Sequence, residues 1–354
     1  MTPDQLDRLA GWTAEHLGAR RVTFADPSKM SGGAIQENWK LDAEVEGGPH
    51  SGSLALVLRT DAPSGVSVSH PRAHEFTLLR AAFGAGVTVP EPLALDETGA
   101  VLGKPFYLMR RAGGTANPRT LARDATLDPD RPALTEAIGR ELARIHTITP
   151  PRADLPFLPG DTRTPVARRL DEFRAQLDAL PRAYPTLEWA IRWIELNAPA
   201  NSASVLGHGD FRCGNIMADG PAVTAVLDWE FATWSDPMED VGWICARCWR
   251  FGADSRRVGG IGDLADLRRG YEAVSGHPLD WETLGFWEVL ATVRWAIIAL
   301  HQGQRHLSGE ERSLELALTG RKAPEMELDL LCQIRALEET GRDEPRFEEN
   351  GDGR

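Results

Sequence analysis

Hydrophobic positions change their spacing about a third of the way along the chain. Up to residue 111 the apolar residues fall in short runs, of which the strongest are Leu54–Leu58, Leu93–Leu95 and Phe106–Met109. Such runs, bounded by polar, proline or glycine positions, are typical of strands. From Pro118 onward apolar residues recur every three or four positions, which is the stripe of a buried helix. The pattern predicts a small sheet followed by a mostly helical region.

Several further segments carry helical spacing. A short amphipathic helix is expected at the N-terminus, on the outside of the sheet, and a second one is closed by Gly84 and Gly86 because glycine favours helix C-termini. The predicted helices cover residues 2–18, 70–82, 132–148, 166–180, 187–196, 263–274 and 281–300.

One stretch in the second half concentrates polar residues around two apolar runs. The run 205–207 ends in His208-Gly-Asp210, and Asn215 follows five residues after the aspartate. A second run, 223–227, ends at Asp228, and Asp219-Gly220 between the runs suits a tight turn. The sequence therefore predicts a hairpin that Asp210 and Asn215 enter and Asp228 leaves.

This arrangement has a chemical interpretation. An aspartate before the strand can accept a proton from a hydroxyl, while an asparagine and a second aspartate hold Mg²⁺, which needs few protein carboxylates when phosphate oxygens complete its shell. His208, Asp210 and Asn215 fit the H-x-D-x-x-x-x-N spacing without a gap. The alternative is an ordinary hairpin whose polar residues cap turns.

His208-Gly-Asp-Phe-Arg-Cys-Gly-Asn215, followed by Leu227-Asp228-Trp-Glu230, resembles the aminoglycoside phosphotransferase family within the protein-kinase-like superfamily. More narrowly, it is similar to the branch related to the kinase-like domain fused to some acyl-CoA dehydrogenases. The resemblance runs from about Gly32 to about Leu300. It implies a two-lobed α+β fold with a small antiparallel-sheet lobe at 1–111 that binds nucleotide. A helical catalytic and acceptor-binding lobe would follow at 112–337, and an acidic mobile tail at 338–354.

The resemblance also implies roles for single residues. Asp210 would be the catalytic base, and Asn215 and Asp228 would bind Mg²⁺. Arg59 stands at the end of a predicted strand, where a kinase carries a phosphate-contacting lysine, and its guanidinium can still donate to phosphate oxygens. Glu75 on the next helix is its expected partner, although a solvated surface glutamate is the alternative.

Two further nucleotide contacts follow from the resemblance. Ser31, Gly32 and Gly33 would lie over the phosphates, with an ordinary hairpin turn as the alternative. Met109 and Arg110 would form the hinge, where adenine binds backbone groups.

Other polar residues are expected to be structural. His208 should hold its loop by hydrogen bonds, and His146 should be a core or cap histidine. Asp236 and Asp240 should accept backbone N–H groups at helix starts. Cys245-x-x-Cys248 sits in an apolar segment without a second ligand pair, which favours buried structural thiols over a metal site.

Composition narrows the function classes. With 354 residues, 42% of them hydrophobic, the chain can bury one large or two moderate cores. A formal charge of −13 argues against a general nucleic-acid binder. The longest apolar stretch, 289–300, is too short to span a bilayer, and the polar N-terminus lacks a signal-peptide pattern. We therefore expect a cytoplasmic monomer or homodimer without membrane contact.

The predicted function is Mg²⁺-dependent transfer of the γ-phosphate of ATP or GTP to a hydroxyl of a small molecule. A hydroxylated metabolite or hydroxyacyl-CoA is the expected acceptor, ahead of an aminoglycoside or macrolide. Two alternatives stay open: a metal-dependent phosphate or ester hydrolase built on His208, Asp210 and Asp228, and a catalytically weak nucleotide-binding scaffold, which the arginine at position 59 makes plausible.

Overall fold

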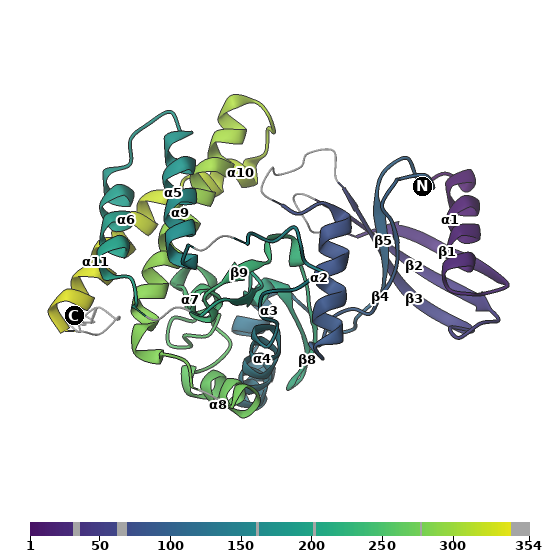
Figure 1. Cartoon of the computed structure of the whole chain (residues 1–354), viewed down its shortest axis with the longest axis horizontal. Helices are drawn as coiled ribbons and strands as arrows, with labels where there is room; N and C mark the ends of the chain where they lie inside the picture. The colour runs from purple at the N-terminus through teal and green to yellow at the C-terminus, as the bar shows by residue number, and fades with distance from the viewer. Residues whose placement is uncertain (31–35, 62–68, 161–162, 201–202, 277, 341–354) are drawn as a thin grey trace, which may run out of the picture.

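The computed structural model describes residues 1–30, 36–61, 69–160, 163–200, 203–276 and 278–340 of the chain. These residues form two lobes, a smaller one built on a sheet and a larger, mostly helical one (Figure 1). The smaller lobe precedes the larger one along the chain, as the spacing of apolar residues predicted.

The small lobe contains one antiparallel five-stranded sheet in the order β1-β2-β3-β5-β4. A helix, α1 (Pro3–His16), covers one face at the outer end of the molecule (Figure 1). The strands are β1 (Arg21–Lys29), β2 (Gln36–Glu46), β3 (Gly52–Asp61), β4 (Pro92–Asp96) and β5 (Phe106–Arg110).

Strand β3 divides its side chains between two environments. Successive side chains of a strand point to opposite faces, so Leu56 and Leu58 pack in an outer core with Leu9 of α1. Val57 points the other way and belongs to the large core that includes the helical lobe. Arg59 shares the face of Val57, and the alternation therefore directs its guanidinium towards the second lobe.

Helix α2 (Arg72–Gly84) lies between the sheet and the large lobe. Its inward residues Phe76, Leu78 and Leu79 belong to the same core as Ile138 and Leu142 of the helical lobe. The hydrophobic core is thus continuous across the boundary between the two lobes, near residue 111.

The helical lobe is organised around α9 (Leu284–Ser308), which packs against α7, α10 and α11. Helix α4 packs against α8 on the opposite side. The remaining helices are α3 (Pro118–Arg123), α4 (Arg131–His146), α5 (Pro165–Asp178), α6 (Pro185–Asn197), α7 (Pro237–Cys245), α8 (Leu264–Ser275), α10 (Leu314–Gly320) and α11 (Ala323–Thr340).

Within the described residues one segment, Trp281–Ser308, is long and apolar enough to cross a membrane by length and composition alone. Of its apolar window, 72% is buried inside the protein, and a core helix passes the same test.

Two short strand pairs pack on helices of the large lobe, where α4 contacts both β6 and β8. β6 (Val205–Gly207) pairs with β9 (Thr233–Ser235), and β7 (Ile216–Asp219) forms a hairpin with β8 (Ala222–Val226). Gly220 in the turn has φ 54°, which glycine adopts without strain. The hairpin predicted from the sequence is therefore confirmed.

The predicted tail begins too early. Residues 338–340 continue α11, because the apolar stripe of that helix runs through Ile334 to Leu337, which pack on the large core. The rest of the predicted tail, 341–354, lies outside the described residues.

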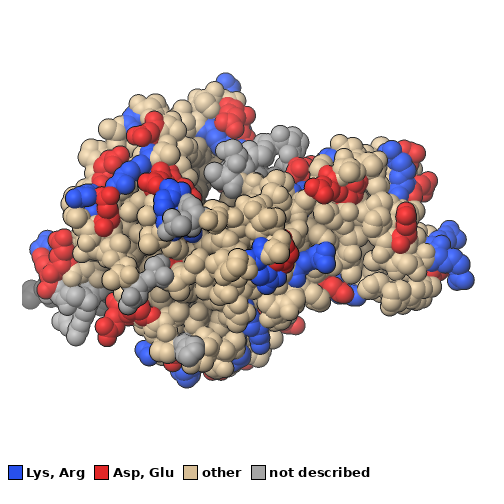
Figure 2. Space-filling view, in the orientation of Figure 1, with Lys and Arg blue, Asp and Glu red and all other residues tan. Residues whose placement is uncertain are grey.

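Charged side chains are mixed on the face shown in Figure 2. Lysine and arginine alternate with aspartate and glutamate around its rim, and no continuous basic field covers it. This face therefore offers no basic stripe of the kind that binds a nucleic-acid backbone.

Candidate active site

The site is built on the sharp corner that follows β6. Gly209 has φ 76°, and a Cβ there would lie 2.2 Å from the carbonyl oxygen of Phe231, so only glycine fits. The neighbouring His208 ring is fully buried. Its Nδ1 accepts the backbone N–H of Asp210 (3.2 Å), and its Nε2 donates to the carbonyl oxygen of Leu227 (2.8 Å). His208 therefore joins the segment of Asp210 to that of Asp228, as predicted, and burial lowers the pKa of its imidazole.

Asp240 stabilises the same corner through hydrogen bonds to its backbone. Its carboxylate accepts the backbone N–H groups of His208 (2.7 Å) and Gly209 (3.0 Å). Asp240 accepts backbone N–H groups, as predicted, but these belong to the corner after β6 and not to the start of α7, in whose first turn Asp240 lies. Asp236 does cap α7, and accepts the backbone N–H of Met238 at 2.9 Å.

Three side chains fix the carboxylate of Asp210. The indole N–H of Trp243 donates to its Oδ1 (2.8 Å), and Nδ2 of Asn215 donates to its Oδ2 (2.7 Å). The Nε of Arg212 lies 3.1 Å from both oxygens. A carboxylate held in this way needs no reorganisation before it accepts a proton.

Asn215 directly precedes β7 and Asp228 lies two residues after β8, and the backbone N–H of Leu227 donates to the Asn215 carbonyl oxygen at 2.8 Å. Asp228 adopts a left-handed conformation (φ 71°), which is uncommon for residues other than glycine. Because Nδ2 of Asn215 is committed to Asp210, its Oδ1 is the atom that remains for a cation.

Arg59 lies between two carboxylates. Its guanidinium donates to Asp228 and contacts Glu75 at 2.8 Å, so the predicted pairing with Glu75 is confirmed. Burial disfavours the charged form of Asp228, but Arg59 outweighs it and keeps the pKa of Asp228 below its ordinary value. Asp228 is therefore ionised at neutral pH, as a ligand of Mg²⁺ must be.

The pair belongs to a larger buried ion network. Arg72 donates to Glu75 and contacts Asp61 at 2.9 Å. Glu230 accepts a hydrogen bond from Gln36, and its carboxylate lies 3.9 Å from Arg72. Burial first, and repulsion from Asp228 second, raise the pKa of Glu230 from 4.5 to about 8.

The remaining predicted nucleotide contacts are the loop 31–33 and the hinge residues Met109 and Arg110. Ser31, Gly32 and Gly33 lie outside the described residues. Met109 and Arg110 end β5, and the N–H of Arg110 donates to the carbonyl oxygen of Glu91 (2.9 Å). The chain therefore leaves the sheet just after these two residues and enters the helical lobe.

The residues present fit a hard cation. Asn215 and Asp228 offer an amide oxygen and an ionised carboxylate, the ligand types that Mg²⁺ prefers. In the part of the chain that the structure describes, no group of three or more His, Cys, Asp or Glu residues could hold a metal by itself. A cation at this site would need ligands from a bound molecule, as it does in phosphoryl transfer.

Cys245 and His146 are buried, as predicted, whereas Cys248 is only half-buried. Cys245 is fully buried, and burial raises its pKa to about 12, so it is not a reactive thiolate. His146 is buried too, with Nδ1 3.0 Å from the Tyr271 hydroxyl and Nε2 3.4 Å from Asp240.

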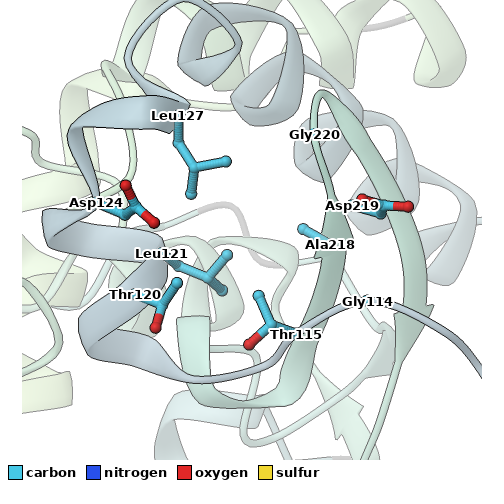
Figure 3. Close-up of a pocket in the computed structure, with 9 residues that line it drawn as sticks. All are labelled: Gly114, Thr115, Thr120, Leu121, Asp124, Leu127, Ala218, Asp219 and Gly220. Carbon is cyan, nitrogen blue, oxygen red and sulfur yellow. The ribbon is translucent and has the colours of Figure 1, made fainter.

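A separate pocket of about 300 Å³ lies between α3 and the far tip of the β7–β8 hairpin (Figure 3). Leu121, Asp124 and Leu127 line it on one side, and Ala218 and Gly220 on the other, with Thr115 bridged to Ala218. The hairpin carries Asn215 and Asp228 at its opposite end, so this pocket is not the site described above.

Sequence reasoning missed Trp243 and Gln36. Trp243 falls in an apolar run, where an indole is normally part of the core, and only its N–H reaches Asp210. Gln36 comes from β2 of the other lobe. Neither residue belongs to the motif spacing, so no local signal in the sequence could single it out.

Comparison with known proteins agrees with this geometry. A profile of the phosphotransferase enzyme family matches residues 28–277, more than two thirds of the chain. Mouse acyl-CoA dehydrogenase family member 10 is 34% identical over 213 residues, which cover 54% of this chain and 18% of that protein. The chain thus spans about a fifth of the length of this relative.

Two solved structures share the fold. A candidate aminoglycoside phosphotransferase from Ralstonia eutropha superimposes with a TM-score of 0.69 at 24% identity, over 91% of this chain and 95% of that one. A thermostable mutant of aminoglycoside phosphotransferase APH(4)-Ia, solved with ADP and hygromycin B, gives 0.56 at 17% identity, over 90% and 98%. The predicted two-lobed kinase-like fold is therefore confirmed, and the chain belongs to the phosphotransferase enzyme family.

Proposed function

We propose that this chain transfers the γ-phosphate of ATP or GTP to a hydroxyl group of a small molecule, with Mg²⁺ bound by Asn215 and Asp228. One observation carries the proposal: the carboxylate of Asp210 is fixed by Asn215, whose backbone binds the residue before Asp228, and Arg59 of the other lobe contacts Asp228 while it pairs with Glu75. These contacts support the proposal, in which Asp210 would be the base, Asn215 and Asp228 the cation ligands, and Arg59 the phosphate-binding cation.

Asp210 would accept the proton of the acceptor hydroxyl. As that oxygen forms its bond to the γ-phosphorus, the bond between this phosphorus and the β-phosphate oxygen breaks, and the nucleoside diphosphate leaves. Asp210 then returns the proton to water. Positioning dominates such a reaction, because little covalent work falls to the protein. Trp243 and Asn215 supply it by holding both carboxylate oxygens of Asp210.

Arg59 would steady the phosphates from the side of the sheet. Its Nε is buried and has no hydrogen-bond partner among the described residues, so the guanidinium retains a donor for an incoming oxygen. Mg²⁺, when bound, would neutralise charge on the phosphate oxygens.

The two alternatives have less support. A hydrolase with its own catalytic ion would need a cluster of protein ligands, and His208 is committed through both ring nitrogens to backbone groups. A catalytically weak scaffold would require that Arg59 cannot bind the phosphates in place of a lysine. Arg59 nevertheless makes the ion pair with Glu75 that is expected of the phosphate-binding residue.

For the acceptor, we propose a hydroxylated metabolite or a hydroxyacyl-CoA in preference to an aminoglycoside or macrolide. The likeness to an acyl-CoA dehydrogenase family member supports this order.

Thermal unfolding with ATP or GTP, each with and without Mg²⁺, tests the proposal. Nucleotide at a hundred times its dissociation constant should add about 2.7 kcal/mol of stability, and the effect should require Mg²⁺. A shift with a divalent metal alone would favour the hydrolase. The absence of any shift would leave the scaffold and remove the basis for phosphoryl transfer.

A further inference from the structure

Arg294 is a cation on an otherwise apolar stretch of α9, and it lies close to Asp210. Its guanidinium stacks on the Trp243 indole, with Cζ 4.4 Å from the ring centroid. The N–H of the same indole donates to Asp210. Arg294 and Asp210 therefore contact the same indole, Arg294 at its face and Asp210 at its N–H.

The acidic groups around Arg294 are already engaged. Glu239 lies 2.7 Å from the guanidinium of Arg169. Asp240 binds the backbone of the β6 corner, and Asp210 is held by Asn215, Trp243 and Arg212. The field at Arg294 is thus set by Arg169 and these three carboxylates, none of which is free to turn towards it.

No carboxylate among the described residues lies within 4 Å of Arg294, and none of their acceptors is hydrogen-bonded to its guanidinium. A partly buried arginine in this situation is unusual, because buried charges are normally paired. Burial lowers the pKa of Arg294, but arginine stays charged in proteins. Stacking on Trp243 satisfies the face of the guanidinium and leaves its edge, which carries all the N–H donors, without an acceptor.

Arg212 provides an internal comparison. It too lies over an indole, 4.8 Å from the centroid of Trp249, but its edge is paired with Asp210. Trp249 in turn packs on Trp243 and Trp295, with ring centroids 5.3 and 4.7 Å apart. Within the described part of the chain, two arginines thus stack on this aromatic cluster, and of the two only Arg294 has an edge without a protein partner.

We propose that Arg294 binds an anionic group, a carboxylate or a phosphate, on the acceptor whose hydroxyl lies at Asp210. The guanidinium edge matches both groups because it donates two parallel N–H bonds to a pair of oxygens. This specificity rests on the proposed phosphoryl transfer and narrows it to hydroxylated anions. It disfavours a cationic aminoglycoside, since like charges would meet at Arg294.

Binding of matched acceptor pairs to the full chain, loaded with Mg²⁺ and a non-hydrolysable ATP analogue, tests the proposal. The probes are straight-chain hydroxy carboxylates of several lengths against their neutral primary amides, glycerol phosphate against glycerol, and kanamycin as a cationic acceptor. The coenzyme A thioesters of the same hydroxy acids are included as anions whose charge lies on phosphates. We expect at least one anionic member to bind on the order of ten- to a hundredfold more tightly than its neutral counterpart. The carboxylate and phosphate arms identify which anion is recognised.

Variants assign the effect to Arg294. In Arg294→Met the preference for the anion should vanish, with a rise in KM rather than a fall in kcat where turnover is detected. Arg294→Lys keeps the positive charge but loses the two parallel N–H donors of the guanidinium, and should restore part of the preference for the anion. The matched control is Arg335→Met, an exposed arginine on α11 that should leave the preference intact.

The outcomes separate the two proposals. If nucleotide and Mg²⁺ do not bind together, the proposed function fails. If they bind, and no anionic probe binds better than its neutral partner, or the preference survives in Arg294→Met, the inference about Arg294 is overturned. Because Arg294 has no acidic partner to strand, Arg294→Met should fold, and its melting temperature checks this.

Discussion

Asp210 shows how closely a single side chain can be constrained before any substrate arrives. Its two oxygens accept from Trp243 and Asn215, which come from different elements. Asp210→Asn keeps the shape but removes the base, so kcat should fall by about 10²- to 10⁴-fold. The dissociation constant for MgATP should change little, because Asp210 does not bind the nucleotide. Turnover equal to that of the wild type, measured with any accepted alcohol, would rule out Asp210 as the base.

The buried carboxyl group of Glu230 should make the stability of the fold depend on pH. Its pKa is raised from 4.5 to about 8 in the fold, so between these values the folded protein holds a proton that the unfolded chain has lost. Stability should therefore fall as the pH rises through this window, since each unit of pKa difference corresponds to about 1.4 kcal/mol. Glu230→Gln should remove this slope.

Urea unfolding of the metal-free protein across this pH range measures the effect of Glu230. The glutamine can keep a hydrogen bond with Gln36, so the variant should be the more stable protein near pH 8. Parallel pH profiles for wild type and variant would show that Glu230 is ionised in the fold.

The sequence could indicate individual residues only where a motif spacing carried them. Asp210, Asn215 and Asp228 were identified together because the two apolar runs fix their separation. Asp240 was identified, but its backbone partners were not, since a carboxylate in the first turn of a helix can also point to a distant corner. Gln36 and Trp243 depend on which elements pack together, which spacing alone does not contain.

At the scale of elements, the β6 corner depends on glycine. In Gly209→Ala the new Cβ would meet the Phe231 carbonyl oxygen at 2.2 Å, and φ 76° is itself unfavourable for alanine. We expect a loss of more than about 1 kcal/mol in the free energy of unfolding, together with lower activity, since the corner positions Asp210.

Gly11→Ala is the matched control for the corner variant. Gly11 is exposed inside α1, and a Cβ there meets no atom within 4 Å. Alanine should stabilise this helix by about 1 kcal/mol. Chemical denaturation of both variants separates the two cases, and equal effects would mean that the corner tolerates a side chain.

Element types were predictable because the two periodicities differ so clearly along the chain. The ends of the elements were less predictable than their types. The predicted boundary between the helical lobe and the tail fell between residues 337 and 338, but α11 continues to Thr340. The direction of Arg59 followed from strand alternation once β3 was recognised, whereas its contact with Asp228 required the placement of both lobes.

At the scale of the whole molecule, hydrogen bonds beyond the connecting segment join the lobes. The His70 backbone N–H donates to the carbonyl oxygen of Glu230 (2.9 Å), and that of Val226 donates to Thr88 (2.8 Å). Thr88 also donates through its hydroxyl to Glu141 at 2.9 Å. The sheet lobe is thus anchored to the segment around Asp228, and the two lobes should unfold together.

Arg59 is the charged part of this connection, and its removal should lower the stability of the whole molecule. Arg59→Met leaves Glu75 and Asp228 without their shared cation, and breaking a buried pair in this way costs roughly 3–5 kcal/mol. The exposed pair Arg8–Asp4 is the control, since Arg8→Met should cost less than about 1 kcal/mol. If Asp228 binds Mg²⁺, the metal with nucleotide should restore more stability to Arg59→Met than it adds to the wild type, because it replaces a missing charge. Equal gains in thermal unfolding would mean that Asp228 does not bind the metal.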